Sequence, residues 1–216
     1  GRAGRYLNDG GFGITGDCKE ISPEEVELIE GHKFEEIRTL FWRNSDLNFN
    51  NPNSLIKSLE ERPQMEWLRK VHECEDERAL KYFIKDEKNN LEFNERTLKL
   101  LWECCQIPDF VKKTYGNHYE VIKNVFKFLN SEKGLISEDY MRLQLMKLDK
   151  LEGNVDSLSN RIANVRTWSY VSNKNNWVEN QNYWIEKTKL LEDKLSDRLH
   201  EELSKTFIDK RASVLA

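Results

Sequence analysis

Several features that would assign a protein to a functional class are scarce in this sequence. Its 216 residues contain four prolines, four cysteines and no CxxC pair. A structural zinc site needs four convergent nitrogen or sulfur ligands, so we expect reduced thiols and no metal site. Basic residues do not outnumber acidic ones (34 against 38, net charge −4). This balance excludes a histone-like basic coat and restricts any nucleic-acid contact to a local patch.

Long apolar segments are also missing. No run approaches the roughly 18 to 20 residues that a membrane-spanning helix needs, and no signal-peptide pattern opens the chain. The mean hydropathy of −0.77 is polar, but aromatic residues make up 11% of the chain, which is too many for a disordered protein. We therefore expect a folded cytoplasmic protein without a membrane partner.

Glycine is concentrated at the beginning of the chain. Six of the ten glycines fall within the first 16 residues. Residues 11–16 alternate small and large side chains with a period of two, which predicts a short strand with close backbone neighbours. Since the composition changes sharply afterwards, we expect residues 1–20 to belong to a different structural unit from the rest.

From residue 21 onwards the sequence predicts a mainly α fold. Ser22 and Glu25 form a capping box around Pro23, and Gly31 ends that helix. Apolar residues at helical spacing predict a helical region over 21–135 and a C-terminal helical bundle over 136–216. The expected helices are short ones at 53–61, 64–72 and 76–86, one after each of Asn94, Asn117, Ser137 and Asn154, and a long one at 181–208. We expect the helix after Ser137 to reach Leu151 and end at Gly153.

The apolar residues of the long helix step by four. They are Leu191, Leu195, Leu199, Leu203 and Phe207. At roughly 100° per residue each step overshoots a full turn by about 40°, so the stripe winds around the helix. A two-stranded coiled coil instead alternates steps of three and four. We therefore expect this helix to cross several neighbours in a bundle.

The first five residues, Gly1-Arg2-Ala3-Gly4-Arg5, carry a motif with a phosphate mechanism. Two arginines three positions apart can reach one anionic group together, and arginine offers a permanently charged, forked set of donors. In phosphoryl transfer such a side chain stabilises charge on the transferring group. The alternative is a flexible terminus rich in glycine and arginine.

This motif and the segments after it resemble the last helicase motif of superfamily 2. They resemble more narrowly the DExH RNA helicases of the mitochondrial-degradosome type, in their bacterial branch. The stretches that carry the resemblance are GRAGRY (1–6), GGFGITGDC (10–18), WRNSDL (42–47), LLWECCQIPDF (100–110), RTWSY (166–170) within 162–177, and the tail 191–211. The resemblance thus touches essentially the whole chain.

The resemblance implies an ATP-dependent RNA helicase with two RecA-like domains followed by helical accessory domains. Residues 1–20 would be a strand-containing remnant of the second RecA-like domain. Arg5 would be the catalytic finger on the γ-phosphate, with Arg2 beside it and Gly4 also at the nucleotide. The implied cofactors of the full-length enzyme are ATP and Mg²⁺. The implied partners are RNA, or DNA, the upstream RecA-like domains and an exoribonuclease.

This sequence has no GxxxxGK loop followed by Ser or Thr and no DExH box. We expect it to be a piece of a longer protein, with no bound cofactor and no ATPase activity on its own.

Residues 155–177 are modestly basic and offer a second candidate site. Arg161, Arg166 and Lys174 could contact the phosphates of single-stranded RNA, with Trp177 in a polar loop stacking on a base. The alternative makes Arg161 and Arg166 ion-pair partners within the bundle. For the whole chain, the alternative function is a non-catalytic helical module that docks another protein.

Overall fold

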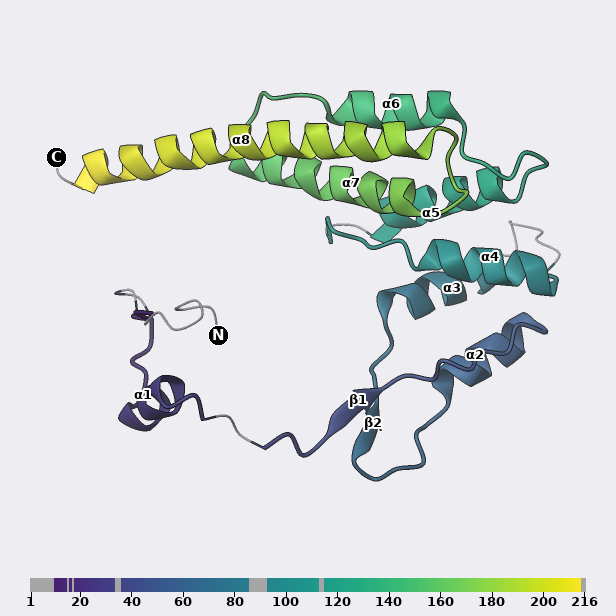
Figure 1. The fold of residues 1–216 in the computed structure, drawn as a ribbon, viewed down its shortest axis with the longest axis horizontal. Coiled ribbons are helices and arrows are strands. Elements are labelled where there is room, and N and C mark those ends of the chain that lie inside the picture. The colour runs from purple at the N-terminus through teal and green to yellow at the C-terminus, as the bar shows by residue number, and fades with distance from the viewer. Residues whose placement is uncertain are drawn as a thin grey trace.

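A computed structural model of the chain describes residues 10–14, 16, 18–33, 36–85, 93–112 and 115–214. Over these residues it contains eight helices and two short strands, so the expected mainly α fold is confirmed. Helices α2 to α5 follow one another in space in the order of the sequence, α6 lies beside the pair formed by α7 and α8, and α1 lies apart from the other helices (Figure 1).

The first helix, α1 (Pro23–Glu30), begins and ends where its capping residues predict. The Ser22 hydroxyl accepts the Glu25 N–H, the Glu25 carboxylate accepts the Ser22 N–H, and Gly31 follows as C-cap. The strand expected over 11–16 does not form in the described residues 10–14 and 16. A Cβ atom added at Gly11 or Gly13 would meet nothing within 4 Å. Within the described residues, this segment forms no strand and has no close neighbour at these two glycines, so the expectation is wrong there.

Two strands form a βαβ unit. Strand β1 (Leu40–Trp42) runs parallel to β2 (Leu68–Lys70), and α2 (Pro52–Glu60) makes the crossover that a parallel pair requires. The helix expected over 64–72 is wrong, because β2 and the turn before it occupy this segment. Its backbone pairs with β1 instead: the Trp67 carbonyl accepts the Leu40 N–H at 3.0 Å.

The next two helices carry the first part of the apolar core. They are α3 (Glu75–Lys85) and α4 (Glu95–Cys105), which pack against each other, with α2 against α3. Asn94 caps α4 through the Thr97 N–H, as its position predicts. Four residues buried in α4 lie on the expected spacing of i, i+3, i+4 and i+7, namely Leu98, Leu101, Trp102 and Cys105, and Cys104 is buried as well.

Helices α5 (Tyr115–Leu129) and α6 (Glu138–Leu148) confirm two predicted elements but shift their ends. The first begins two residues before Asn117. The second begins after its predicted cap, Ser137, but ends at Leu148 instead of reaching Leu151. The chain leaves the helix at Asp149, and the carbonyl groups of the segment that follows bond to Arg161 of the next helix.

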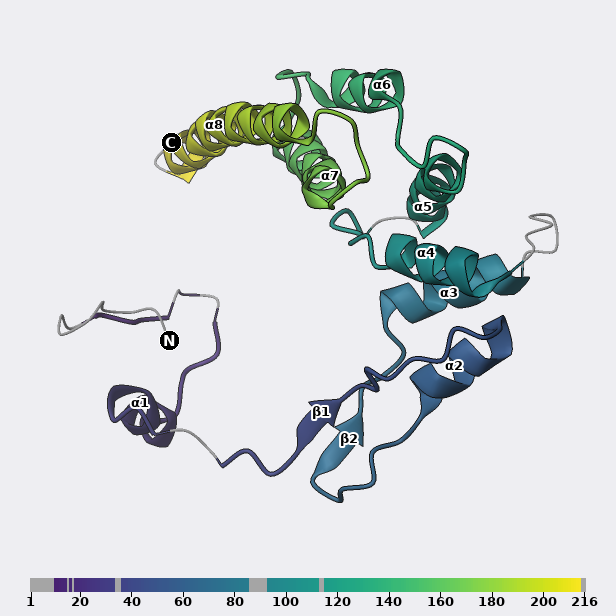
Figure 2. The same cartoon turned by 45° about the vertical axis from the view of Figure 1, so that its right-hand side comes forward.

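Helices α7 (Val155–Asn173) and α8 (Gln181–Val214) lie side by side in both ribbon views (Figures 1 and 2). The predicted cap Asn154 accepts the Ser157 N–H at the start of α7. Because α8 packs mainly along α7, the expectation that it crosses several neighbours is wrong. The buried residues of α8 include Trp184, Thr188, Leu191 and Leu195. They are separated by four, three and four residues, which is the spacing of a helix that packs along one partner. With 34 residues against 19, α8 also extends well past α7.

Candidate nucleic-acid interface

The predicted nucleotide-contacting residues Arg2, Gly4 and Arg5 lie outside the described residues. Their roles stay predictions that follow from the sequence motif. The second predicted site, over 155–177, lies within α7 and the segment that leads to α8, and the structure describes all four of its residues.

Both arginines of this second site contact the protein itself. Arg166 Nε donates to Glu192 Oε1 at 2.8 Å, which joins α7 to α8. Arg161 Nη1 donates to the carbonyl of Lys150 at 2.9 Å and also to that of Glu152. For Arg166 this ion pair agrees with the alternative interpretation, in which the arginine pairs within the bundle. Arg161 instead bonds to main-chain oxygens of the turn before α7.

Trp177 is buried, which contradicts the expectation that it is exposed in a polar loop. Only 5% of its surface is accessible, so neither face of its ring is free to stack on a base. Its carbonyl accepts the Ile136 N–H at 2.8 Å. The ammonium of Lys174 lies 5.8 Å from the centre of this ring and 5.0 Å from that of Tyr170. The polar neighbours of Trp177 in the sequence therefore surround a core residue, and Lys174 packs on the aromatic rings.

A more suitable surface for single-stranded nucleic acid lies on the β1–β2 pair. Phe41 and Arg69 are opposite each other in the register, so both side chains stand on the same face. Phe41 is 71% exposed, and Trp67, directly before β2, is 52% exposed. We call Phe41, Trp67 and Arg69 the ribbon face. It combines two accessible aromatic rings with a guanidinium group.

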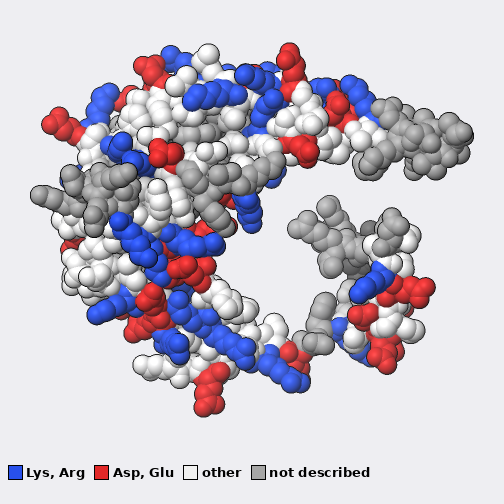
Figure 3. Space-filling view, turned by 180° about the vertical axis from the view of Figure 1, so that it is seen from behind, with Lys and Arg blue, Asp and Glu red and all other residues white. Residues whose placement is uncertain are grey.

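The surroundings of the ribbon face are basic. A hollow of about 500 Å³ at β2 is lined by Arg62, Arg69, Lys70 and His72, and by one carboxylate, Glu73, which is paired with Lys81 at 2.8 Å. Glu66 is the one acidic residue between positions 62 and 72. On the side of the molecule seen in Figure 3, Lys and Arg lie over the region of β1 and β2, with Asp and Glu side chains among them. This is a local positive patch on a protein whose overall charge is negative.

The ribbon is anchored to the helices through the residue that follows β1. Arg43 makes a forked pair with Asp76 of α3, through Nη1 to Oδ2 at 2.8 Å and Nη2 to Oδ1 at 3.0 Å. Its guanidinium carbon also lies 5.2 Å from the centre of the Trp102 ring of α4. Burial lowers the pKa of Arg43, but the hydrogen bonds and charge of Asp76 outweigh it and raise the pKa. These contacts join β1 to both helices.

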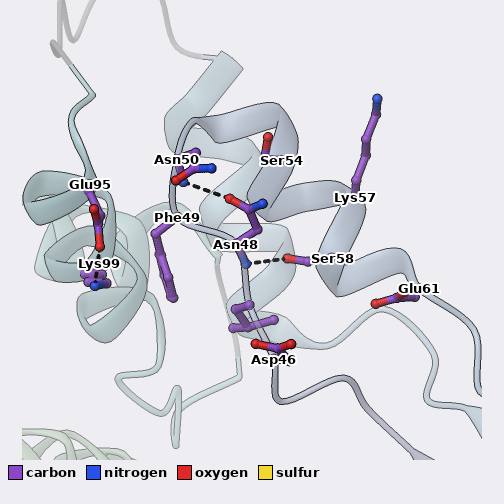
Figure 4. Close-up of a pocket in the computed structure, with 11 residues that line it drawn as sticks. Asp46, Asn48, Phe49, Asn50, Ser54, Lys57, Ser58, Glu61, Glu95 and Lys99 are labelled. Atoms are coloured by element: carbon purple, nitrogen blue, oxygen red, sulfur yellow. Dashed lines mark hydrogen bonds and ion pairs between the residues drawn. The ribbon is translucent and has the colours of Figure 1, made fainter.

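A second hollow, of about 810 Å³, lies between the loop at 46–50, α2 and α4 (Figure 4). Its polar groups pair with one another. The Asn48 N–H donates to Ser58 Oγ at 3.1 Å, and Lys99 pairs with Glu95 at 2.6 Å. Lys99 also faces the ring of Phe49, 5.7 Å from its centre. Carboxylates and ammonium groups both line this hollow, so it lacks the single charge that attracts a phosphate chain.

Metal and thiol chemistry find no support in the described ranges. No group of three or more His, Cys, Asp or Glu side chains is placed there to hold a metal ion. Cys104 and Cys105 are free thiols in the core, and burial raises the pKa of each. Because the thiolate is the reactive form, these two cysteines are chemically inert in the folded protein.

Phe41 and Trp67 are not among the residues that the sequence predicts for a nucleic-acid contact. The available signal was a tryptophan flanked by Arg62 on one side and by Arg69 and Lys70 on the other, without leucines at helical spacing. The expectation of a helix over 64–72 hid this signal, because it placed Trp67 on a helix and not beside a strand.

Comparisons with protein-family models, with curated proteins and with solved structures found no match. Within the described residues, no helix has the length and apolar character required to cross a membrane. The functional assignment therefore depends on the sequence motifs and on the geometry of the ribbon face.

Proposed function

We propose that this chain is the C-terminal helical part of a cytoplasmic ATP-dependent RNA helicase, and that the ribbon face contacts single-stranded RNA. Residues 1–20 would complete the second RecA-like domain of that enzyme. The GRAGR motif at 1–5 and the further resembling segments support the helicase class. The observation that carries the RNA contact is the exposed pair Phe41 and Arg69 on one face of a parallel ribbon.

The chemistry of the ribbon face suits unpaired nucleotides. An aromatic ring and a guanidinium plane both stack on bases, and stacking tolerates any sequence because every base has a π face. Arg62 lines the same hollow as Arg69, where it can neutralise phosphates. A helicase needs contacts of this kind because it moves along strands of any sequence.

The motor chemistry belongs to residues outside the described part of the chain. Arg5 would stabilise charge on the γ-phosphate as the nucleotide is hydrolysed, with Arg2 beside it. ATP and Mg²⁺ would be held by the upstream RecA-like domains, since no cluster of metal-binding side chains occurs in the described residues. Closure of those domains on the nucleotide would then move RNA past the ribbon face, which Arg43 ties to α3 and α4.

The RNA contact is tested by fluorescence anisotropy of a labelled single-stranded RNA with this chain. Loss of a stacking ring costs about 1–3 kcal/mol, so Phe41→Ala is expected to weaken binding by about 5- to 150-fold. Arg69→Glu is expected to weaken binding and to make it less dependent on salt. The matched controls are Phe110→Ala and Lys127→Glu, which change exposed residues outside the ribbon. Equal losses in variants and controls would refute the contact.

The helicase assignment is tested by RNA-stimulated ATP hydrolysis of the full-length protein with Arg5→Ala. An arginine finger contributes about 10³- to 10⁵-fold to turnover, so a loss of that size is expected while ATP still binds. Arg5→Lys keeps the charge but loses the fork, and it should restore little of the activity. Full turnover in Arg5→Ala would remove the assignment and leave the RNA contact to be judged by its own experiment.

The alternative function, a non-catalytic docking module, draws support from a different surface. An apolar groove lies between α6 and α8, far along the chain from the ribbon face. The two functions do not exclude each other, because a helicase can also recruit a partner protein through its accessory region.

A further inference from the structure

The groove between α6 and α8 combines a buried apolar floor with an exposed apolar rim. Leu145, Trp184 and Leu191 form the floor and are almost fully buried. Met146 and Leu190 stand on the rim, and each is 65% exposed. The groove encloses about 350 Å³. Exposed apolar side chains gathered around a hollow, instead of scattered singly, are typical of a surface that binds a partner.

A buried polar atom in this groove has no partner. Trp184 is 2% exposed, and its indole Nε1–H makes no hydrogen bond to any residue that the structure describes. A buried donor without an acceptor costs about 1–3 kcal/mol. Trp184 also lines a second hollow that adjoins the groove, together with Glu138, Arg142 and Asn180. Protein atoms enclose this N–H, so a molecule bound in the groove does not reach it.

The charged residues around the groove favour an acidic occupant. Arg142, Lys187 and Lys194 line it, against one carboxylate, Asp149. Asp149 is already paired with Lys194 at 2.8 Å. Arg142 has only a long contact of 3.3 Å with Asp139, whose side chain is almost fully exposed. The positive charges of Arg142 and Lys187 therefore remain to attract carboxylates.

We propose that this groove binds a short acidic segment of a partner protein. An aliphatic or aromatic side chain of that segment lies on the floor formed by Leu145, Trp184 and Leu191. Carboxylates beside it pair with Lys187 and Arg142. This inference needs neither ATP hydrolysis nor the ribbon face.

RNA is the less suitable occupant of the groove. Trp184 is buried, so its ring is not free to stack on a base, and Tyr183, 55% exposed, is the one accessible aromatic ring among the residues that line the groove. The floor is apolar, and a phosphate chain has no apolar group to place on it. An apolar anchor flanked by carboxylates matches both the floor and the rim, whereas a phosphate chain matches the rim alone.

The experiment measures fluorescence anisotropy of short fluorescein-labelled peptides with this chain. One peptide set places leucine or phenylalanine between glutamates, a second replaces the glutamates by lysines, and a third replaces the apolar anchors by serines. We expect only the first set to bind, and we expect an unlabelled single-stranded RNA to leave its binding unchanged. Equal binding of the acidic and basic sets, or displacement of the acidic peptide by RNA, would overturn the proposal.

Substitutions place the peptide in the groove. Lys187→Glu is expected to weaken binding of the acidic peptide by at least about tenfold, equivalent to about 1.4 kcal/mol. Lys189→Glu is the matched control, because this exposed lysine of α8 does not line the groove. Trp184→Phe keeps an aromatic floor and the charged rim, so it should leave binding nearly unchanged while the protein stays folded by circular dichroism. Equal losses in Lys187→Glu and Lys189→Glu would contradict the proposed geometry.

Discussion

Removing the Arg43 side chain should destabilise the whole junction between the ribbon and the helices. In Arg43→Ala, Asp76 loses both guanidinium hydrogen bonds, and Trp102 loses the cation above its ring. A hydrogen bond to a charged group contributes about 1.5–3 kcal/mol, and a cation–π contact near the surface about 0.5–1 kcal/mol. Because Arg43 is about one-third exposed, solvent screens part of this energy. We expect a loss of about 2–3 kcal/mol in the free energy of unfolding.

The assay is thermal unfolding followed by circular dichroism. In a protein of 150–250 residues, 1 kcal/mol lowers Tm by about 2–4 °C, so Arg43→Ala should lower Tm by about 4–12 °C. Arg142→Ala is the control, because its pair with Asp139 is exposed and such pairs contribute about 0–1 kcal/mol. Combining Arg43→Ala with Asp76→Asn should cost less than the sum of the single changes, with a coupling of about 1–2 kcal/mol. If Arg43→Ala lowers Tm no more than Arg142→Ala does, the contacts of Arg43 with Asp76 and Trp102 do not stabilise the junction.

Three further results are expected of the folded chain. Trp177→Ala should lower the free energy of unfolding by about 3–5 kcal/mol, because it empties a core site, and leave RNA affinity unchanged. Burial lowers the pKa of His118, so below about pH 6.5 the unfolded chain binds more protons than the folded protein, and the free energy of unfolding falls as the pH falls. The urea midpoint should therefore be lower at pH 5 than at pH 7.5, and His118→Gln should make this difference smaller. A thiol reagent should leave Cys104 and Cys105 unmodified until denaturant is added, and fast labelling of all four cysteines would contradict their burial.

The helices were predictable from local chemistry. Ser22, Asn94, Ser137 and Asn154 all cap helices at the positions where the sequence places them, because a cap needs only its own side chain and the next few N–H groups. The apolar face of α4 was equally predictable, since burial of one stripe follows from helical spacing. These features depend on contacts within a few residues of the chain.

The errors arose where distant residues decide the outcome. Residues 68–70 form a strand because β1 supplies the bonding partner from 28 residues earlier in the register. Trp177 is buried beside a distant segment, whose Ile136 N–H donates to the Trp177 carbonyl, and its polar neighbours in the sequence do not reveal this contact. The ribbon face depends on the register between two strands, so Phe41 and Arg69 could not be brought together from local patterns.

Because α8 is longer than α7, its C-terminal end should open more readily than the rest of the helix. The 15 extra residues of α8, 34 against 19, span about 22 Å at 1.5 Å per residue. Within this overhang the described side chains make contacts along the helix itself, such as Lys205 with Glu202 at 3.9 Å. A helix held by such pairs frays at low energy and is weakened by salt. Amide hydrogens should therefore exchange progressively faster towards Val214. Those beside Leu191 and Leu195 should exchange only when α8 separates from α7.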